Sequence, residues 1–186
     1  MKLVIQRVKQ AKVEVKGKVA GEIEKGFLVL IGITHTDTRQ EADYLAKKLC
    51  NLRVFEDENQ KMNRNLKDVK GKLLIVSQFT LYANCKDGNR PSFTDAAKPE
   101  MANELYEYFC EKCEEYQIEV QKGIFGADMQ VSLINDGPVT IVMEKWPTGD
   151  GAFWIKVTPK VPYPMSHFGP KETEFVFNKE IFHIDT

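Results

Sequence analysis

Three short stretches of the sequence carry side-chain and backbone groups that could bind a ligand or act on it. Residues 77–81 (SQFTL) place hydroxyl and amide groups at the end of an apolar run, where burial is costly unless they form hydrogen bonds. Residues 135–140 (NDGPVT) contain a Gly-Pro bond, which tolerates the cis form and can then present carbonyl oxygens as rigid acceptors. Residues 88–93 (GNRPSF), with Lys86 before them, form a loop that can meet a phosphate and stack on a base. The simpler interpretations are a strand that runs into solvent, a hairpin turn and an ordinary surface loop.

Familiar catalytic motifs are missing from the sequence. Residues 1–145 contain one histidine, His35, so any Ser–His or Cys–His pair there would have to use it. Cys110 and Cys113 form a lone CxxC inside a helical pattern, which favours packing on an apolar face over metal or redox chemistry. The stretch GIFG at 123–126 lacks the lysine of a phosphate-binding loop.

The composition is that of a globular protein. The chain has 186 residues, 42% hydrophobic and 28% charged, with a net charge of −1. Strong non-specific binding of nucleic acid requires a basic excess, which this chain does not have. The apolar runs are too short to span a bilayer and the N-terminal one is too short for a signal peptide, so we expect a cytoplasmic protein.

The composition changes near residue 146. Residues 146–186 hold five of the eight prolines and both tryptophans. We therefore predict a domain over residues 1–145 and a Pro- and aromatic-rich C-terminal extension over residues 146–186.

The order of apolar patterns predicts an α+β fold. Strand patterns fill residues 1–33, with a central strand at 27–33, and a second buried strand is expected at 72–80. Helical spacing follows Asp37, the expected N-cap, and resumes at Pro99. Strand-like runs return at 118–144, broken at Gly123, Gly126 and 135–138. This order implies a mostly antiparallel or mixed sheet covered by two helices.

Taken together, these segments resemble one known family. SQFTL at 77–81 and NDGPVT at 135–140 are similar to the two signature motifs of D-aminoacyl-tRNA deacylases. The resemblance extends over residues 1–145 through four further segments, which are RVKQAKVEV from Arg7, LRVFEDENQKMN at 52–63, GNRPSFTDAA from Gly88 and GIFGADMQVSLINDGPVT from Gly123. The extension departs from the family, whose members usually end near Lys145.

The resemblance implies a barrel-like homodimer that hydrolyses the ester between a D-amino acid and the 3′-terminal adenosine of tRNA. Glycine carried on tRNA is accepted too, and no metal or organic cofactor is implied. In the family the peptide between Gly137 and Pro138 is cis and reaches across the dimer into the partner's pocket. Its carbonyl oxygens would collide with an L side chain, and Arg7, with Asn135 and Thr140, would support it.

The resemblance also assigns the opposite wall of the site. Backbone N–H groups in the segment Ser77, Gln78, Phe79 and Thr80 would hold the ester carbonyl and stabilise an oxyanion. Phe125 and Met129 would border the terminal adenosine, unless they are core residues, and Lys86 and Arg90 would meet phosphates.

Several alternatives stay open at this point. The Thr80 side chain is a second candidate as a covalent nucleophile, although no base to activate it is evident. The chain could instead hydrolyse other small esters, or bind tRNA ends without catalysis. The extension could add strands at a sheet edge through 153–155 and 174–177, or contact a partner.

Overall fold

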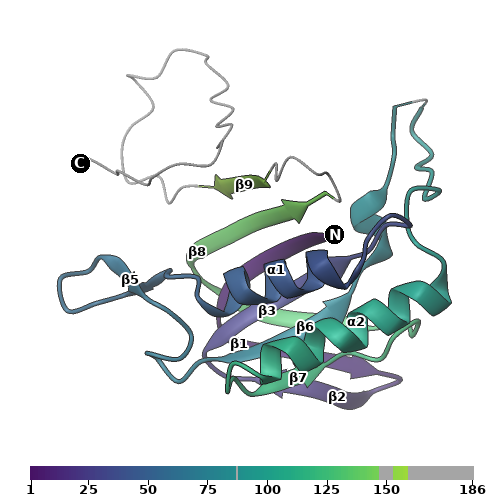
Figure 1. Cartoon of the computed structure of the whole chain (residues 1–186). Helices are drawn as coiled ribbons and strands as arrows, with labels where there is room; N and C mark the ends of the chain where they lie inside the picture. The colour runs from purple at the N-terminus through teal and green to yellow at the C-terminus, as the bar shows by residue number, and fades with distance from the viewer. Residues whose placement is uncertain (87, 147–152, 159–186) are drawn as a thin grey trace.

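The computed structural model describes residues 1–86 and 88–146 in full, and the backbone of residues 153–158. Helices separate groups of consecutive strands along the chain (Figure 1). The elements are β1 (Lys2–Val15), β2 (Lys18–Ile23), β3 (Gly26–Gly32), α1 (Arg39–Cys50), β4 (Phe55–Glu56), β5 (Met62–Arg64), β6 (Lys72–Ser77), the 3-10 helix η1 (Phe79–Tyr82), α2 (Pro99–Glu114), β7 (Val120–Lys122), β8 (Gln130–Lys145) and β9 (Phe153–Thr158).

The main sheet is mixed and nearly closes on itself. Its order is β7-β6-β3-β1-β8-β9, with β2 paired to β1. The β3–β6 and β6–β7 pairs are parallel, whereas β1 pairs antiparallel with β2, β3 and β8. The sheet curls until β2 approaches β7 (Figure 1), and a Cβ at Gly21 would lie only 2.8 Å from the Lys122 carbonyl oxygen. The predicted barrel-like α+β fold is therefore confirmed.

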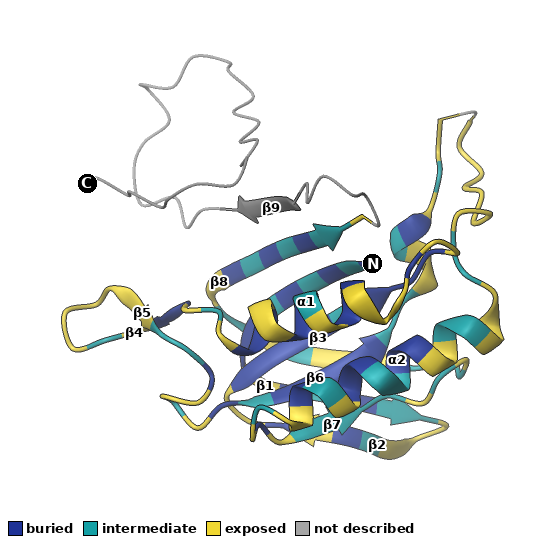
Figure 2. Ribbon diagram, in the orientation of Figure 1, coloured by how far each residue is buried: buried dark blue, intermediate teal, exposed yellow. Residues whose placement is uncertain are grey.

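Both helices lie on the same face of the sheet (Figure 1). Each buries the apolar stripe that its sequence pattern predicts, and these buried residues belong to the same core as those of the sheet, dark blue in Figure 2. The fully buried stripe of α2 includes Cys110 and Cys113, and Cys50 lies in the same core at the end of α1. The lone CxxC is thus part of the core, as predicted.

The predicted start of α2 at Pro99 is confirmed, but the predicted cap of α1 is one residue off. Thr38, not Asp37, is the N-cap, and its side chain forms a capping box with Glu41. Asp37 is buried instead. Its carboxylate accepts the backbone N–H of Thr34 and pairs with the ammonium group of Met1.

Two strand predictions need correction where the candidate motifs lie. The buried strand β6 ends at Ser77 rather than Thr80, because the chain turns into η1. The break expected at 135–138 is absent, because β8 runs through it and is no hairpin turn there. Instead, Val8 pairs with Asn135 and Gln6 with Thr140, so residues 136–139 lie opposite Arg7 alone as a wide bulge.

The start of the extension adds a strand to the sheet edge. β9 pairs antiparallel with β8, from Lys145 opposite Phe153 to Thr140 opposite Thr158. This confirms the interpretation of 153–155 as an added strand, whereas the second segment, 174–177, lies outside the described residues. The domain boundary at residue 145 stays a prediction.

Candidate active site

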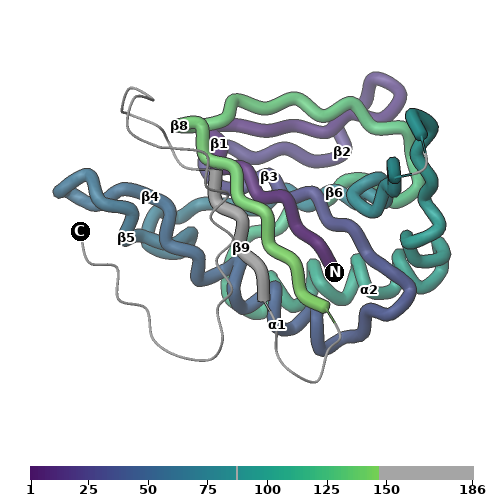
Figure 3. The backbone as a smooth tube through the Cα atoms, turned by 90° about the horizontal axis from the view of Figure 1, so that it is seen from above, coloured from purple at the N-terminus to yellow at the C-terminus, as the bar shows by residue number. Residues whose placement is uncertain are grey.

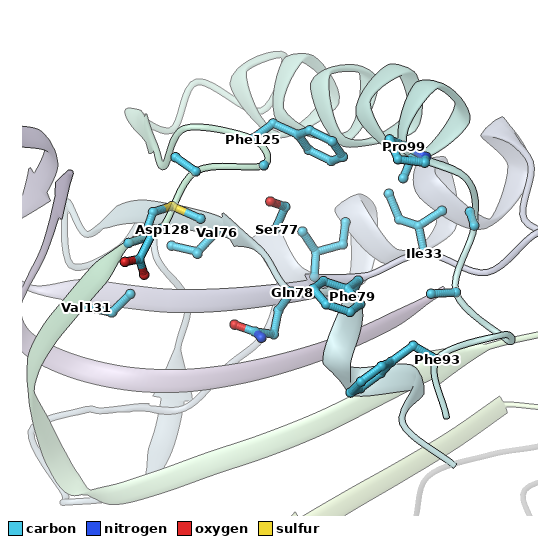
Figure 4. Close-up of a pocket in the computed structure, with 17 residues that line it drawn as sticks. Ile33, Val76, Ser77, Gln78, Phe79, Phe93, Pro99, Phe125, Asp128 and Val131 are labelled. Carbon is cyan, nitrogen blue, oxygen red and sulfur yellow. The ribbon is translucent and has the colours of Figure 1, made fainter. Parts of the chain in front are cut away.

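A cavity of about 630 Å³ opens where β6 ends (Figure 4). Four segments line it: the end of β3, the end of β6 with the start of η1, the loop into α2 with the first turn of that helix, and the loop between β7 and β8 with the start of β8. Ser77 lies between Phe125 on one side and Phe79 on the other, and Gln78 and Met129 also line the wall. The structure thus gathers five of the predicted site residues around one hollow.

The backbone of this wall leaves hydrogen-bond donors free. The Gln78 N–H donates to the Ile31 carbonyl oxygen at 2.8 Å and so extends the β3–β6 ladder. Within the described chain, the next two N–H groups, of Phe79 and Thr80, have no acceptor, because they begin η1. Two adjacent free donors at a cavity mouth can hold a carbonyl oxygen and the oxyanion that forms from it.

The Thr80 side chain has no base beside it. Its Oγ1 accepts a hydrogen bond from the Gln78 amide, which cannot take up a proton, and Thr80 does not belong to the described cavity lining. His35 is exposed in the turn before α1 and does not belong to that lining either. The geometry therefore favours the backbone donors over a threonine nucleophile.

The aromatic side chains form the apolar walls. Phe125 is half-buried and packs against the buried Tyr106, with ring centroids 6.0 Å apart, so it belongs to both the core and the cavity. Across the opening, the rings of Phe79 and Phe93 meet edge to face at 5.1 Å although Phe79 is 58% exposed. Exposed aromatic rings of this kind can stack on a base.

Two residues of this lining were not singled out from the sequence. Phe93 lies at the end of the GNRPSF loop, which is predicted to stack on a base, but Phe93 itself is not among the predicted site residues. Asp128 lies between the two predicted residues of the GIFGADM stretch and is an acidic member of an otherwise largely apolar wall. Its position between Phe125 and Met129 in the sequence is the signal that could have identified Asp128 as a residue of the cavity lining.

The predicted phosphate contacts are not part of the cavity. Lys86 and Arg90 are exposed on the loop between η1 and α2, which projects from the sheet (Figure 1). A bridge between Asn84 and Ser92 closes this loop at its base, next to Phe93. The two cations are therefore held away from the apolar hollow, beyond its rim.

The Gly137–Pro138 peptide is cis, and its neighbours hold it tightly. The Asn135 Oδ1 accepts the Val139 N–H at 2.8 Å, and the Asn135 Nδ2 reaches Thr140 Oγ1 at 3.3 Å. These contacts tie the two ends of the bulge together, and the supporting role of Asn135 and Thr140 stays a prediction.

Arg7 fills the concave side of this bulge. The side chain is 4% exposed, its Nε donates to the Asp136 carbonyl oxygen at 2.9 Å, and its Nη1 donates to the Val54 carbonyl oxygen. The Nε also lies 3.6 Å from the Asp136 carboxylate. A Cβ at Gly137 would lie 3.1 Å from Arg7 Nη2, so the guanidinium packs directly against the glycine.

Within one chain, Gly137 and Pro138 of the NDGPVT motif do not line the cavity that the SQFTL motif helps to form. Val131 of β8 lines the cavity, whereas Gly137 and Pro138, further along the same strand, are outside its described lining. Six residues of extended strand span about 20 Å. The cis peptide therefore lies well along β8 from the cavity of its own chain.

The remaining reactive groups of the core are inert. Burial raises the pKa of the Cys110 thiol to about 12, and the pKa of Cys113 is also raised, by its hydrogen bond with Cys50 and by burial. Thiols of this kind form little nucleophilic thiolate near pH 7. In the fully described residues no group of His, Cys, Asp or Glu side chains could hold a metal ion, and no helix is long and apolar enough to cross a membrane.

Known proteins resemble this chain along most of its length. A sequence model described as "D-Tyr-tRNA(Tyr) deacylase" matches residues 4–144. A D-aminoacyl-tRNA deacylase of Fusobacterium nucleatum subsp. nucleatum is 61% identical over 144 residues, 77% of this chain and 95% of the relative. Another, of Exiguobacterium sibiricum, is 57% identical over 145 residues, 78% of this chain and all of the relative.

Solved structures agree with these matches. A structure titled "c-Myc DNA Unwinding Element Binding Protein" has a TM-score of 0.73 at 42% identity and covers 78% of this chain and 99% of its own. A "probable eukaryotic D-amino acid tRNA deacylase" has a TM-score of 0.63 at 17% identity, covers 74% and 95% of the two chains, and shows the shared fold alone. The family resemblance predicted from the SQFTL and NDGPVT motifs is confirmed, and this chain belongs to the D-Tyr-tRNA(Tyr) deacylase family.

Proposed function

We propose that this chain hydrolyses the ester that joins a D-amino acid, or glycine, to the 3′-terminal adenosine of tRNA in the cytoplasm. The observation that carries this proposal is the cis Gly137–Pro138 peptide held by Arg7 in a member of a deacylase family. A rigid pair of carbonyl oxygens can reject one enantiomer by collision, which is an effective means of discrimination when both substrates contain the same groups. Glycine passes because it has no Cβ.

The site would be completed across a homodimer. Gly137–Pro138 lies about 20 Å of strand beyond Val131 and outside the lining of its own chain's cavity, so we expect it to enter a partner's cavity. A two-fold axis places each chain's cis peptide in the other's cavity, which gives two equivalent sites.

The reaction needs no side-chain nucleophile. Water adds to the ester carbonyl carbon, the N–H groups of Phe79 and Thr80 hold the oxyanion, and the bond to the ribose 3′ oxygen then breaks, with a proton passing to that oxygen. The adjacent 2′-hydroxyl is placed to assist this proton transfer. Each oxyanion donor is worth about 3 kcal/mol of transition-state stabilisation.

The rest of the tRNA end would follow the cavity outward. Phe125 and Met129 offer an apolar wall for the terminal adenine, and the Phe79–Phe93 pair lies on the opposite rim. Lys86 and Arg90, on the projecting loop, are placed for phosphates further back in the strand.

The direct test compares D-tyrosyl-, L-tyrosyl- and glycyl-tRNA at one enzyme concentration. We expect release of the amino acid from the D and glycyl esters and not from the L ester. Equal release from D and L esters would exclude chiral selection. Binding of tRNA without release from any ester would indicate a binding module, and release from simple esters without RNA would indicate a general esterase.

Complementation tests the cross-subunit site. Phe79→Pro removes one oxyanion N–H, and Pro138→Ala alters the selecting peptide. Phe79→Pro should lose activity, whereas Pro138→Ala should stay active but hydrolyse the L ester as well as the D ester. If the site joins two chains, refolding equal amounts of the two variants makes half the dimers mixed, and the one working cavity of each mixed dimer meets an intact Gly137–Pro138, so about half of the working cavities regain selection. Each variant refolded alone is the control. A site contained in one chain would give no recovery of selection.

A further inference from the structure

The added strand β9 occupies the outer edge of β8 next to the cis peptide. β1 pairs along one edge of β8 (Figure 3), and on the other edge β9 pairs with residues 140–145 (Figure 1). Its last residue, Thr158, lies opposite Thr140, which is two residues beyond Pro138. The end of β9 nearest the site is therefore a direct neighbour of the proposed chiral-selecting element.

Strand β9 lies beyond the part of this chain that its relatives match. The Exiguobacterium relative is matched over its whole length by 145 residues, and the family match ends at residue 144. Without β9, the backbone N–H and C=O groups on the outer edge of β8 over 140–145 would have no strand beside them. An open edge of this kind is a template on which another strand can pair.

A second copy would need this same surface. Inserting Gly137–Pro138 into a partner's cavity brings the partner against the outer side of β8, since β1 already covers the inner side. An isologous contact at that edge would set residues 140–145 of the two copies near each other around the two-fold axis. β9 fills the position that such a contact requires.

We propose that the outer edge of β8 over residues 140–145 is the docking surface for a second copy of this chain, and that β9 competes for it. This inference rests on the cross-subunit site of the proposed function. β9 is tethered to β8 by the seven residues between Lys145 and Phe153, so its effective concentration is high, and a free copy must displace it. The extension thereby lowers dimer formation and, with it, deacylase activity.

The experiment weakens the β9 pairing without removing the extension. In an antiparallel pair, adjacent residues direct their N–H groups to opposite sides, so the double variant Ile155→Pro/Lys156→Pro removes the donor that faces β8 whichever residue supplies it. The matched control is Ile155→Ala/Lys156→Ala, which shortens the same side chains and keeps both N–H groups. Chains ending at Lys145 form the third sample.

Dimer dissociation constants come from light scattering and sedimentation over a concentration series, and activity comes from D-tyrosyl-tRNA. We expect the proline variant and the shortened chain to dimerise at least about tenfold more tightly than the full chain, and to gain activity in parallel at low concentration. The alanine control should stay close to the full chain.

Equal dissociation constants for the full chain and the proline variant would overturn the competition. A full chain that dimerises more tightly than the shortened one would overturn it as well, since β9 would then support the dimer. Failure of the cross-subunit site gives a different result: the shortened chain dimerises, but the Phe79→Pro and Pro138→Ala variants of that shortened chain do not complement each other.

Discussion

Replacing Arg7 by lysine tests whether a geometric restraint on the cis peptide sets the chiral selection. Arg7 donates to the carbonyl oxygens of Asp136 and Val54 from a single planar guanidinium, and it is almost fully buried. Lysine keeps the positive charge but presents it as a point, so it cannot reach both acceptors in the same directions.

The structure sets the size of the effect. One charge-assisted hydrogen bond is lost and one buried carbonyl oxygen loses its donor, which costs about 2 kcal/mol. For a chain of this length that lowers the melting temperature by roughly 4–8 °C. If the same free energy restrains the carbonyl oxygen of Gly137, discrimination between D and L esters falls by about thirtyfold.

The assay measures D-tyrosyl- and L-tyrosyl-tRNA deacylation and thermal unfolding on the same preparations. Arg39→Lys is the matched control, because Arg39 pairs with Glu104 at 3.0 Å on the exposed surface. That control should change stability by less than about 0.5 kcal/mol and leave selection intact. Selection that is unchanged in Arg7→Lys, with stability reduced as expected, would show that Arg7 supports the fold and not the selecting peptide.

Three further outcomes are expected. Gly137→Ala should destabilise the protein by about 1–3 kcal/mol more than Gly88→Ala, because the two glycines share a φ near +137° but only Gly137 has atoms within 3.2 Å of the new Cβ. Urea unfolding measures this difference in stability, and equal losses in the two variants would contradict the crowding at Gly137. Iodoacetamide at pH 8 should label Cys85 alone until urea exposes the three buried thiols, as mass spectrometry would show; labelling of several thiols in the native protein would contradict their burial. Lys86→Ala and Arg90→Ala should each reduce the salt dependence of tRNA binding by about one ion, and an unchanged slope would remove that residue from the phosphate contacts.

Local patterns predicted the elements that bury one face. The helical spacing of α1 and α2 and the apolar runs of β3 and β6 are properties of short windows, so they could be found without knowing what packs against them. The α1 cap was misplaced because Asp37 and Thr38 both fit a capping box locally. The choice between them depends on the Met1 ammonium, which binds Asp37 from across the fold.

The site, too, was predicted only in parts, because local patterns show which segments carry functional groups but not which distant strands pair with them. Ser77–Phe79, Phe125 and Met129 come from motifs that lie on the cavity wall, and the structure brings them together. The NDGPVT stretch resembles a turn when taken alone, yet it is a bulge in a continuous strand because β1 pairs on both sides of it and Arg7 fills its hollow. No window of sequence contains that long-range pairing.

The continuity of β8 has a consequence for how this protein can vary. The strand carries Val131, a cavity wall residue, and Gly137–Pro138, six residues later and inside the bulge, on one continuous stretch of backbone. Deleting or inserting one residue between Val131 and the bulge would turn the side chains on one side of the change to the opposite face of the sheet. In the two-fold arrangement proposed above, that one change would alter the wall of one catalytic centre and the selecting peptide of the other at once. The number of residues between Val131 and Gly137 therefore affects the geometry of both catalytic centres.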